Sequence, residues 1–316
     1  MRTRTKVGVP ILAVAVLVAG YAFRPERLVV NRRVDEAMPN APGALAAQPL
    51  ESGRLYSILH PTEGVDFVLK PRINRASGKS GQSVTVLLEQ NGLTKTVEGS
   101  HVLVATGRTP NTQGIGLELA GVELSHSGYI KVNENLQTTA PGVWAIGEVA
   151  GSPQFTRVSV DDFRVVYASI TGGKRVTTGR QNPFCLFTDP EFARIGLSEK
   201  EAKRQGIAYR LFKIPMNAVL RATTLSETRG FLKASVEIEG EHILGFTALG
   251  VGAGEIIASV QIAMTSGLPY TTLRDSILTH PTLVDGFIPL FSSSASKAES
   301  IAKDNRTGLL RKRVSH

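Results

Sequence analysis

The sequence predicts an α+β protein, in which a strand-rich central region precedes a domain built on an antiparallel sheet. Two observations predict this. Apolar, β-branched runs separated by turn residues begin near residue 65, and strands alternate with helical patterns from residue 183 to 291. The chain has 316 residues, which is enough for two domains, and shows no internal repeat. We therefore divide it into segments 1–33, 34–64, 65–181, 182–295 and 296–316.

The central region is expected to consist of short strands. Residues 83–90 and 93–99 predict a hairpin, because Asn91–Gly92 between them accepts the positive φ angles of a tight turn. Residues 101–107 are a continuous apolar run, which predicts a strand buried on both faces. Further strands are expected at 128–139 and 142–148.

The segment 182–295 is expected to be the antiparallel α+β domain. Ser198 and Glu201 have the spacing of a capping box, so a helix should begin at Ser198, and Gly206 should end it. A second, longer helix is expected over 252–267, where apolar residues recur at helical spacing. Strands are expected at 184–190, 209–214, 231–239 and 242–249, with a short helix at 271–278.

Charge and cysteine content exclude several functional classes. The net charge of +9 is concentrated in residues 1–33 and 297–316, which carry +6 and +4 and leave the rest near −1. A neutral body offers no basic surface, so no nucleic-acid partner is expected. The one cysteine, Cys185, excludes an internal disulfide, a redox dithiol and a cysteine-rich zinc site. Its apolar neighbours predict an inert core residue, and we expect no metal site.

The amino-terminal segment is expected to be a single-pass membrane anchor. Residues 7–23 are uncharged and follow three basic residues, which suits a short membrane span. A cleaved signal peptide and a buried core helix remain alternatives. Residues 34–64 are interpreted as a linker and 296–316 as a basic disordered tail. The corresponding location is the membrane, with the cytoplasm as the alternative if the amino-terminal segment is a fusion artefact.

Three motifs give the sequence a family resemblance. VLVATGRTPN at 102–111, VWAIGE at 143–148 and HPTLVD at 280–285 occur in one order along the chain. From residue 65 to 293 the chain resembles the carboxyl-terminal half of the FAD-dependent pyridine nucleotide–disulfide oxidoreductases, such as mercuric reductase and dihydrolipoamide dehydrogenase. The resemblance implies that 65–181 is an incomplete FAD- and NAD(P)-linked α/β region and 182–295 a dimerisation domain.

The second flavin motif of that family is represented by Thr138, Gly147 and Glu148. The glycine lets the backbone approach a ligand, and the carboxylate can accept a hydrogen bond from a ribityl hydroxyl. Glu148 stands where the family has Asp, which moves the carboxylate by about one bond. The resemblance implies FAD as a cofactor, and NAD(P)H with less support.

His280 and Asp285 are the catalytic candidates. In the family, the resembling His-Pro-Thr-x-x-Glu segment enters the partner subunit's active site, where the histidine exchanges protons with a redox thiol. An imidazole suits this exchange, and a carboxylate orients it. Here the acid is Asp285, and a histidine beside a proline, as at His280–Pro281, is often structural.

The functional interpretation depends on three elements that this sequence does not contain. It has no GxGxxG loop for FAD, no Cys-x4-Cys pair and no second glycine fingerprint for NAD(P)H. We therefore expect a truncated oxidoreductase that is not catalytic alone. The alternatives are a dimerisation module acting in trans on an intact reductase, as a homodimer or heterodimer through 182–295, and a non-functional fusion remnant.

Overall fold

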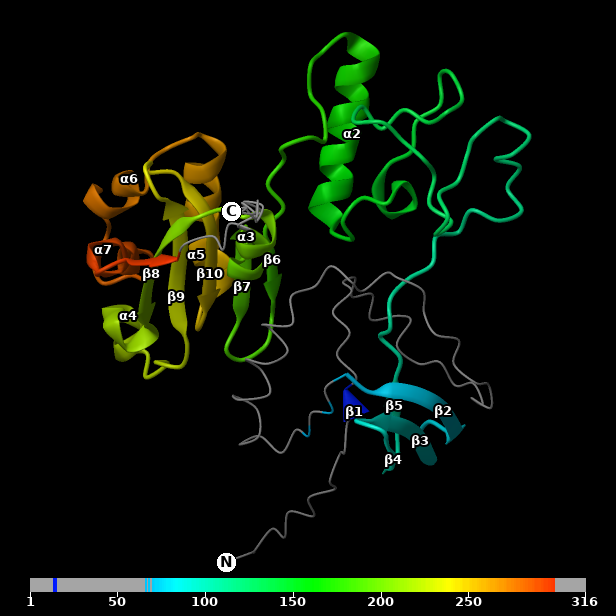
Figure 1. Cartoon of the computed structure of the whole chain (residues 1–316), viewed down its shortest axis with the longest axis horizontal. Coiled ribbons are helices and arrows are strands. Elements are labelled where there is room, and N and C mark those ends of the chain that lie inside the picture. The colour runs from blue at the N-terminus through cyan, green and yellow to red at the C-terminus, as the bar shows by residue number, and fades with distance from the viewer. Residues whose placement is uncertain (1–13, 16–65, 67, 69, 299–316) are drawn as a thin grey trace, which may run out of the picture. The chain divides into compact units, whose positions relative to one another are not determined.

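The computed structural model describes residues 14–15, 66, 68 and 70–298 (Figure 1). The chain forms two compact units, Met1–Thr178 and Gly179–His316. The predicted linker lies outside the described residues, and so do the anchor except for residues 14–15 and the tail except for 296–298. In the described part, no helix is both long and apolar enough to cross a bilayer.

The first unit begins with a three-stranded antiparallel meander. Its strands are β2 (Arg72–Lys79), β3 (Ser83–Gln90) and β4 (Leu93–Gly99). Asn91 and Gly92 join β3 to β4 with φ angles of 54° and 78°, which confirms the predicted hairpin. Alternate side chains bury one face of the meander, and these are Ala76, Val84, Val86 and Leu88.

The expected buried strand at 101–107 is wrong. Only β5 (Val102–Leu103) is a strand, and it pairs in parallel with β1 (Val14–Ala15). Leu103 and Val104 are about half exposed, at 54% and 52%. The run is apolar enough for a central strand, but a pairing of only two residues leaves its side chains uncovered. The local sequence pattern therefore does not indicate burial here.

Residues 104–146 form turns and isolated bridges around a small core of Val122, Ile130, Ala140 and Ala145. The strands expected at 128–139 and 142–148 are reduced to isolated bridges such as Val132–Thr138 and Gln137–Trp144. A 3-10 turn η3 (Gly147–Ala150) then leads to helix α2 (Thr156–Thr171), which was not predicted from the sequence.

The second unit contains a six-stranded sheet in which every neighbouring pair is antiparallel, as predicted. The strand order is β11-β8-β9-β10-β7-β6. The strands are β6 (Phe184–Leu186), β7 (Phe192–Gly196), β8 (Tyr209–Pro215), β9 (Phe231–Glu237), β10 (Ile243–Leu249) and β11 (Ser296–Ala298).

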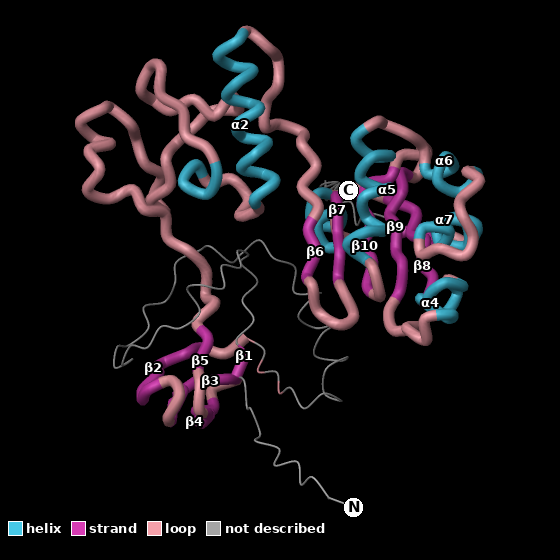
Figure 2. Tube along the Cα trace, turned by 180° about the vertical axis from the view of Figure 1, so that it is seen from behind, coloured by secondary structure: helices cyan, strands magenta, loops and turns pink. Residues whose placement is uncertain are grey.

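Helices cover both faces of this sheet. The alternation of side chains along a strand determines which residues face which helix. On β7, Ala193 and Ile195 point toward the core, where α5 (Ala253–Thr265) packs on β7 and β10. Figure 2 shows α5 lying over these strands. Arg194, between them, points to the other face and meets α3 (Glu199–Gln205). The remaining short helices are η4 (Met216–Ala218), α4 (Leu220–Thr224), α6 (Tyr270–Asp275), η5 (Val284–Gly286) and α7 (Phe287–Ser292).

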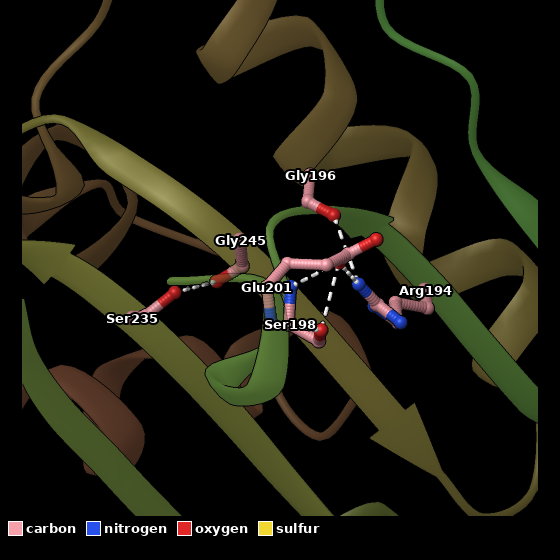
Figure 3. Close-up of polar contacts among 6 residues, drawn as sticks. All are labelled: Arg194, Gly196, Ser198, Glu201, Ser235 and Gly245. Atoms are coloured by element: carbon pink, nitrogen blue, oxygen red, sulfur yellow. Dashed lines mark hydrogen bonds and ion pairs between the residues drawn. The ribbon is translucent and has the colours of Figure 1, made fainter. Parts of the chain in front are cut away.

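The capping box predicted for α3 is present. The Ser198 hydroxyl accepts a hydrogen bond from the Glu201 backbone N–H at 3.0 Å, and the Ser198 backbone N–H donates to Glu201 Oε2 at 2.8 Å. Figure 3 shows the same carboxylate reaching Arg194 on β7. The helix ends at Gly206, whose φ of 69° is left-handed. Glu201 therefore both caps the amino-terminal end of α3 and attaches the helix to β7.

Candidate functional site

His280 and Asp285 lie together in the segment between α6 and α7. The His280 Nδ1 atom is 2.6 Å from Asp285 Oδ2. The two side chains differ greatly in exposure, at 65% for His280 and 9% for Asp285. The pair therefore presents an imidazole to solvent on a carboxylate that is fixed inside the domain.

The core of the domain holds Asp285 in place. Phe287 and Leu290 are fully buried on α7, directly after the 3-10 turn that carries Asp285. Gly286 lies so close to Val219 and Leu232 that an added Cβ would come within 2.9 Å and 3.0 Å of their methyl groups. Burial on one side of the turn thus determines where the carboxylate sits.

This arrangement suits proton exchange with a group on another molecule. An ionised carboxylate only accepts hydrogen bonds, so the Nδ1 atom of His280 carries the proton and Nε2 is left with its lone pair. The exposed ring can present that lone pair as a general base, and Asp285 stabilises the imidazolium that results. The 2.6 Å contact and the exposed ring are compatible with this chemistry.

The one thiol of the chain does not complete this pair. Cys185 lies on the edge strand β6, whereas α7 packs against β8 near the opposite edge of the sheet. Burial, and then the charges of Glu191 and Glu255, raise the pKa of the Cys185 thiol to about 12. A thiol of that kind is protonated at neutral pH and is a poor nucleophile. Within the described residues, no group of His, Cys, Asp and Glu side chains is arranged to hold a metal ion.

The residues of the predicted flavin motif have separate roles in the first unit. The Thr138 hydroxyl donates to the Ala140 carbonyl at 3.3 Å and accepts from the Ala140 N–H at 3.2 Å, so it closes its own turn. Gly147 has a φ of 73°, and its N–H donates to Asp162 Oδ2 at 2.7 Å. The Glu148 carboxylate forms an ion pair with Arg108. Gly147 and Glu148 are consecutive in the chain, and the Thr138 hydroxyl is engaged within its own turn.

Of these residues, Glu148 fits a flavin best. Its side chain is 36% exposed, so the carboxylate can accept a hydrogen bond from a ribityl hydroxyl while Arg108 balances its charge. Gly147 shows no such fit, because an added Cβ would lie 3.1 Å from Ser159 Oγ and the protein's own side chain therefore occupies the space beside the glycine. FAD, when bound, would supply two-electron transfer, and Glu148 would hold its sugar-alcohol chain.

Sequence reasoning missed two residues of this region. Asp162 is fully buried on α2 and accepts the Gly147 N–H, and Arg108 reaches Glu148 across 40 residues of sequence. An acid between the apolar residues Val158 and Val165 of one helix was the available signal for Asp162. The partner of Arg108 could not be inferred, because nothing local links the two motifs.

Comparison with protein families covers both units. Residues 42–162 match the pyridine nucleotide-disulphide oxidoreductase family, and residues 182–289 match its dimerisation domain. The chain belongs to the pyridine nucleotide-disulphide oxidoreductases. This confirms the resemblance noted in the sequence. Membership of this family implies FAD and NAD(P)H as the family's cofactors.

Several relatives support the same assignment. A probable pyridine nucleotide-disulfide oxidoreductase, RclA of Escherichia coli, is 38% identical over 232 residues, which are 73% of this chain and 52% of the relative. Dihydrolipoyl dehydrogenase of Thermus scotoductus is 37% identical over 212 residues, 66% of this chain and 46% of the relative. Mercuric reductase of Staphylococcus aureus is 34% identical over 246 residues, which are 74% of this chain and 45% of the relative. The chain spans about half the length of these relatives.

Solved structures agree with the fold of this pyridine nucleotide-disulphide oxidoreductase. The structure described as the HOCl-induced flavoprotein disulfide reductase RclA from Escherichia coli has a TM-score of 0.70 and 34% sequence identity. The match covers 80% of this chain and 58% of that one. The α+β architecture is therefore shared with flavoprotein disulfide reductases.

Proposed function

We propose that this chain acts within a dimeric disulfide oxidoreductase, where its His280–Asp285 pair serves the active site of a partner subunit. The observation that carries the proposal is the 2.6 Å contact between His280 Nδ1 and the buried Asp285 carboxylate, with the imidazole 65% exposed. The match of residues 182–289 to the dimerisation domain supports an arrangement in which that exposed imidazole meets a second chain.

The proposed chemistry is a proton transfer. A thiol of the partner subunit gives its proton to His280 Nε2, which leaves a thiolate and an imidazolium, and the Asp285 carboxylate stabilises the positive charge. The proton returns to sulfur when the thiol is regenerated. The substrate class is accordingly a disulfide or dithiol, and FAD bound in the assembly would carry the electrons.

We further propose that the chain as it stands does not turn over alone. The sequence contains one cysteine, Cys185, and one cysteine cannot form a redox disulfide within the chain. The raised pKa of Cys185, about 12, also supports an inert thiol. A dimerisation module that acts in trans accounts for an ordered His280–Asp285 pair without a thiol to serve.

The test is complementation between subunits. An intact reductase of the family, carrying glutamine at the position that matches His280, is mixed with this chain, and NAD(P)H oxidation is measured. Wild-type chain should restore turnover, whereas His280→Gln should restore none. His242→Gln is the matched control, because His242 is also exposed, at 58%, and also contacts an acid, Glu237, at 3.0 Å.

Two results would contradict the proposal. Equal restoration by wild type and His280→Gln would remove His280 from the reaction. If sedimentation equilibrium shows this chain as a strict monomer, both alone and in the mixture, it does not act within a dimer. Desalting after addition of FAD tests the further alternative that the chain is catalytic alone. Flavin absorbance that is retained after desalting, together with NAD(P)H oxidation by the chain alone, would show autonomous catalysis.

We also propose a membrane location, supported by the uncharged run at 7–23. Alkaline extraction of membranes from expressing cells tests it. Release of the full-length chain into the supernatant would overturn it.

A further inference from the structure

Thr282 is the centre of the turn that carries the His280–Asp285 pair. Its hydroxyl donates to the Thr279 carbonyl at 2.8 Å and accepts from the Asp285 backbone N–H at 3.2 Å. The Thr282 backbone N–H points back to Asp285 Oδ2 at 3.5 Å. Thr282 and Asp285 thus contact each other reciprocally at the i, i+3 spacing of a capping box, although the N-cap of the 3-10 turn itself is Leu283.

The hydroxyl makes the shorter contacts of this pattern. The return contact of 3.5 Å is at the outer limit of a hydrogen bond, so it constrains Asp285 only slightly. The hydroxyl bonds of 2.8 Å and 3.2 Å fix the backbone on both sides of the turn. Because the Asp285 side chain extends from that backbone, the Thr282 hydroxyl bonds act on the position of Oδ2 from the solvent side of the turn, as the packing of Gly286 does from the core side.

The same Oδ2 atom is the partner of the imidazole. Asp285 Oδ2 lies 2.6 Å from His280 Nδ1 and therefore selects the tautomer of the ring. We propose that Thr282 is a positioning residue, whose hydroxyl places Asp285 so that His280 keeps its proton on Nδ1 and presents Nε2 to the partner thiol. Its significance for catalysis rests on the proposed function, but its effect on the tautomer does not.

An ordinary turn residue would behave differently. If Thr282 only stabilised the turn, its loss would lower the free energy of unfolding and leave the imidazole of the folded protein unchanged. A positioning residue instead changes the tautomer while the fold persists. Serine keeps the hydroxyl and valine keeps the shape, so the two substitutions separate these roles.

The primary experiment reads the imidazole directly in the full chain. Long-range nitrogen–proton NMR correlations of isotopically labelled protein, recorded at about pH 8 where a free imidazole is neutral, distinguish Nδ1–H from Nε2–H. The chain has six histidines, and His280→Gln assigns the His280 signals by their disappearance. Wild type and Thr282→Ser should show the Nδ1–H form, and Thr282→Val should show a mixture of both.

Thr271→Val is the matched control, since the Thr271 hydroxyl bonds to the Glu241 carboxylate at 3.0 Å elsewhere in the same unit. It should leave the His280 signals unchanged. Folded Thr282→Val with the Nδ1–H form intact would overturn the proposal. If Thr282→Val does not fold, a folded Thr282→Ser protein with mixed tautomers would overturn it equally.

A second readout connects the tautomer to turnover. In the complementation assay, Thr282→Val should lower kcat in proportion to its loss of the Nδ1–H form, about twofold for an even mixture, with little change in KM, because binding is kept and the base is present in a smaller fraction of molecules. Thr282→Ser should restore kcat. Failure of wild type itself to complement would contradict the proposed function alone, since the tautomer measurement requires neither partner nor flavin.

Discussion

The guanidinium of Arg194 on β7 is paired with the carboxylate of Glu201 on α3. The Arg194 side chain is only 6% exposed, and its Nε atom is buried without a hydrogen-bond partner, whereas Glu201 is 36% exposed. Arg194 Nη2 also donates to the Gly196 carbonyl at 3.3 Å. Glu201 is thus the counter-charge that makes a buried arginine tolerable on this face of the sheet.

Glu201→Gln should therefore lower the free energy of unfolding by about 2 kcal/mol, a value reduced from that of a fully buried pair because Glu201 is partly solvated. Glutamine keeps the shape of the side chain and removes the charge opposite Arg194. Glu227→Gln is the control, because its partner Arg229 is 41% exposed and that change should cost less than about 0.5 kcal/mol. Urea denaturation measures both. Equal losses would show that burial of Arg194 is not the cause.

The same Glu201 carboxylate should make part of the domain's free energy of unfolding sensitive to acid. Burial opposes its ionisation, but hydrogen bonds from Ser198 and the charge of Arg194 outweigh burial, and the pKa of Glu201 is lowered from 4.5. The unfolded chain thus takes up the proton at a higher pH than the native protein. The stabilisation is present above about pH 4.5 and is lost as the pH falls through the native pKa. The stability difference between wild type and Glu201→Gln should shrink over this range, and a constant difference would refute the linkage.

The α3 helix also shows what the sequence could predict. Ser198, Glu201 and Gly206 are local signals, and each is found in its predicted role. The hairpin at Asn91–Gly92 follows for the same reason, since the residues that make a turn are adjacent in the chain. His280 and Asp285 are five residues apart in one short segment, so their contact was also within reach of sequence reasoning.

Features that depend on distant partners could not be predicted in this way. The apolar run at 101–107 suggested a buried strand, but whether a strand is buried depends on neighbours that the run itself does not specify. The Arg108–Glu148 pair joins residues 40 positions apart. The Arg194–Glu201 pair joins residues only seven apart, but it was missed because the sequence pattern does not show which face of β7 the α3 helix covers.

Cys185 should be nearly unreactive in the folded protein. Burial is the main cause of its raised pKa of about 12, and the charges of Glu191 and Glu255 add to it. At about pH 8 its alkylation should be at least about a hundredfold slower than that of an exposed thiol, and denaturation in urea should abolish the difference. The comparison protein is Cys185→Ser with Lys203→Cys, which moves the single thiol to an exposed position. Rapid labelling of native Cys185 would contradict the prediction and reopen a role for it as a nucleophile.

Gly286→Ala should disturb the His280–Asp285 pair from the core side. Gly286 has a φ of −58°, which any residue can adopt, so the cost is steric rather than conformational. The added methyl group would meet Val219 at 2.9 Å and Leu232 at 3.0 Å, and we expect a loss of about 1–3 kcal/mol in the free energy of unfolding. Since Asp285 directly precedes this residue, the His280 Nδ1–H signal should weaken as well.

Val219→Ala tests this mechanism because it removes the methyl groups that the new side chain meets. The double variant should lose less stability than the sum of the two single variants, since each substitution relieves the packing defect of the other. Denaturation of all four proteins gives the coupling free energy, and NMR of His280 shows whether the tautomer returns with it. Strictly additive losses would mean that the turn at Asp285 is positioned by some contact other than the packing of Gly286 on Val219.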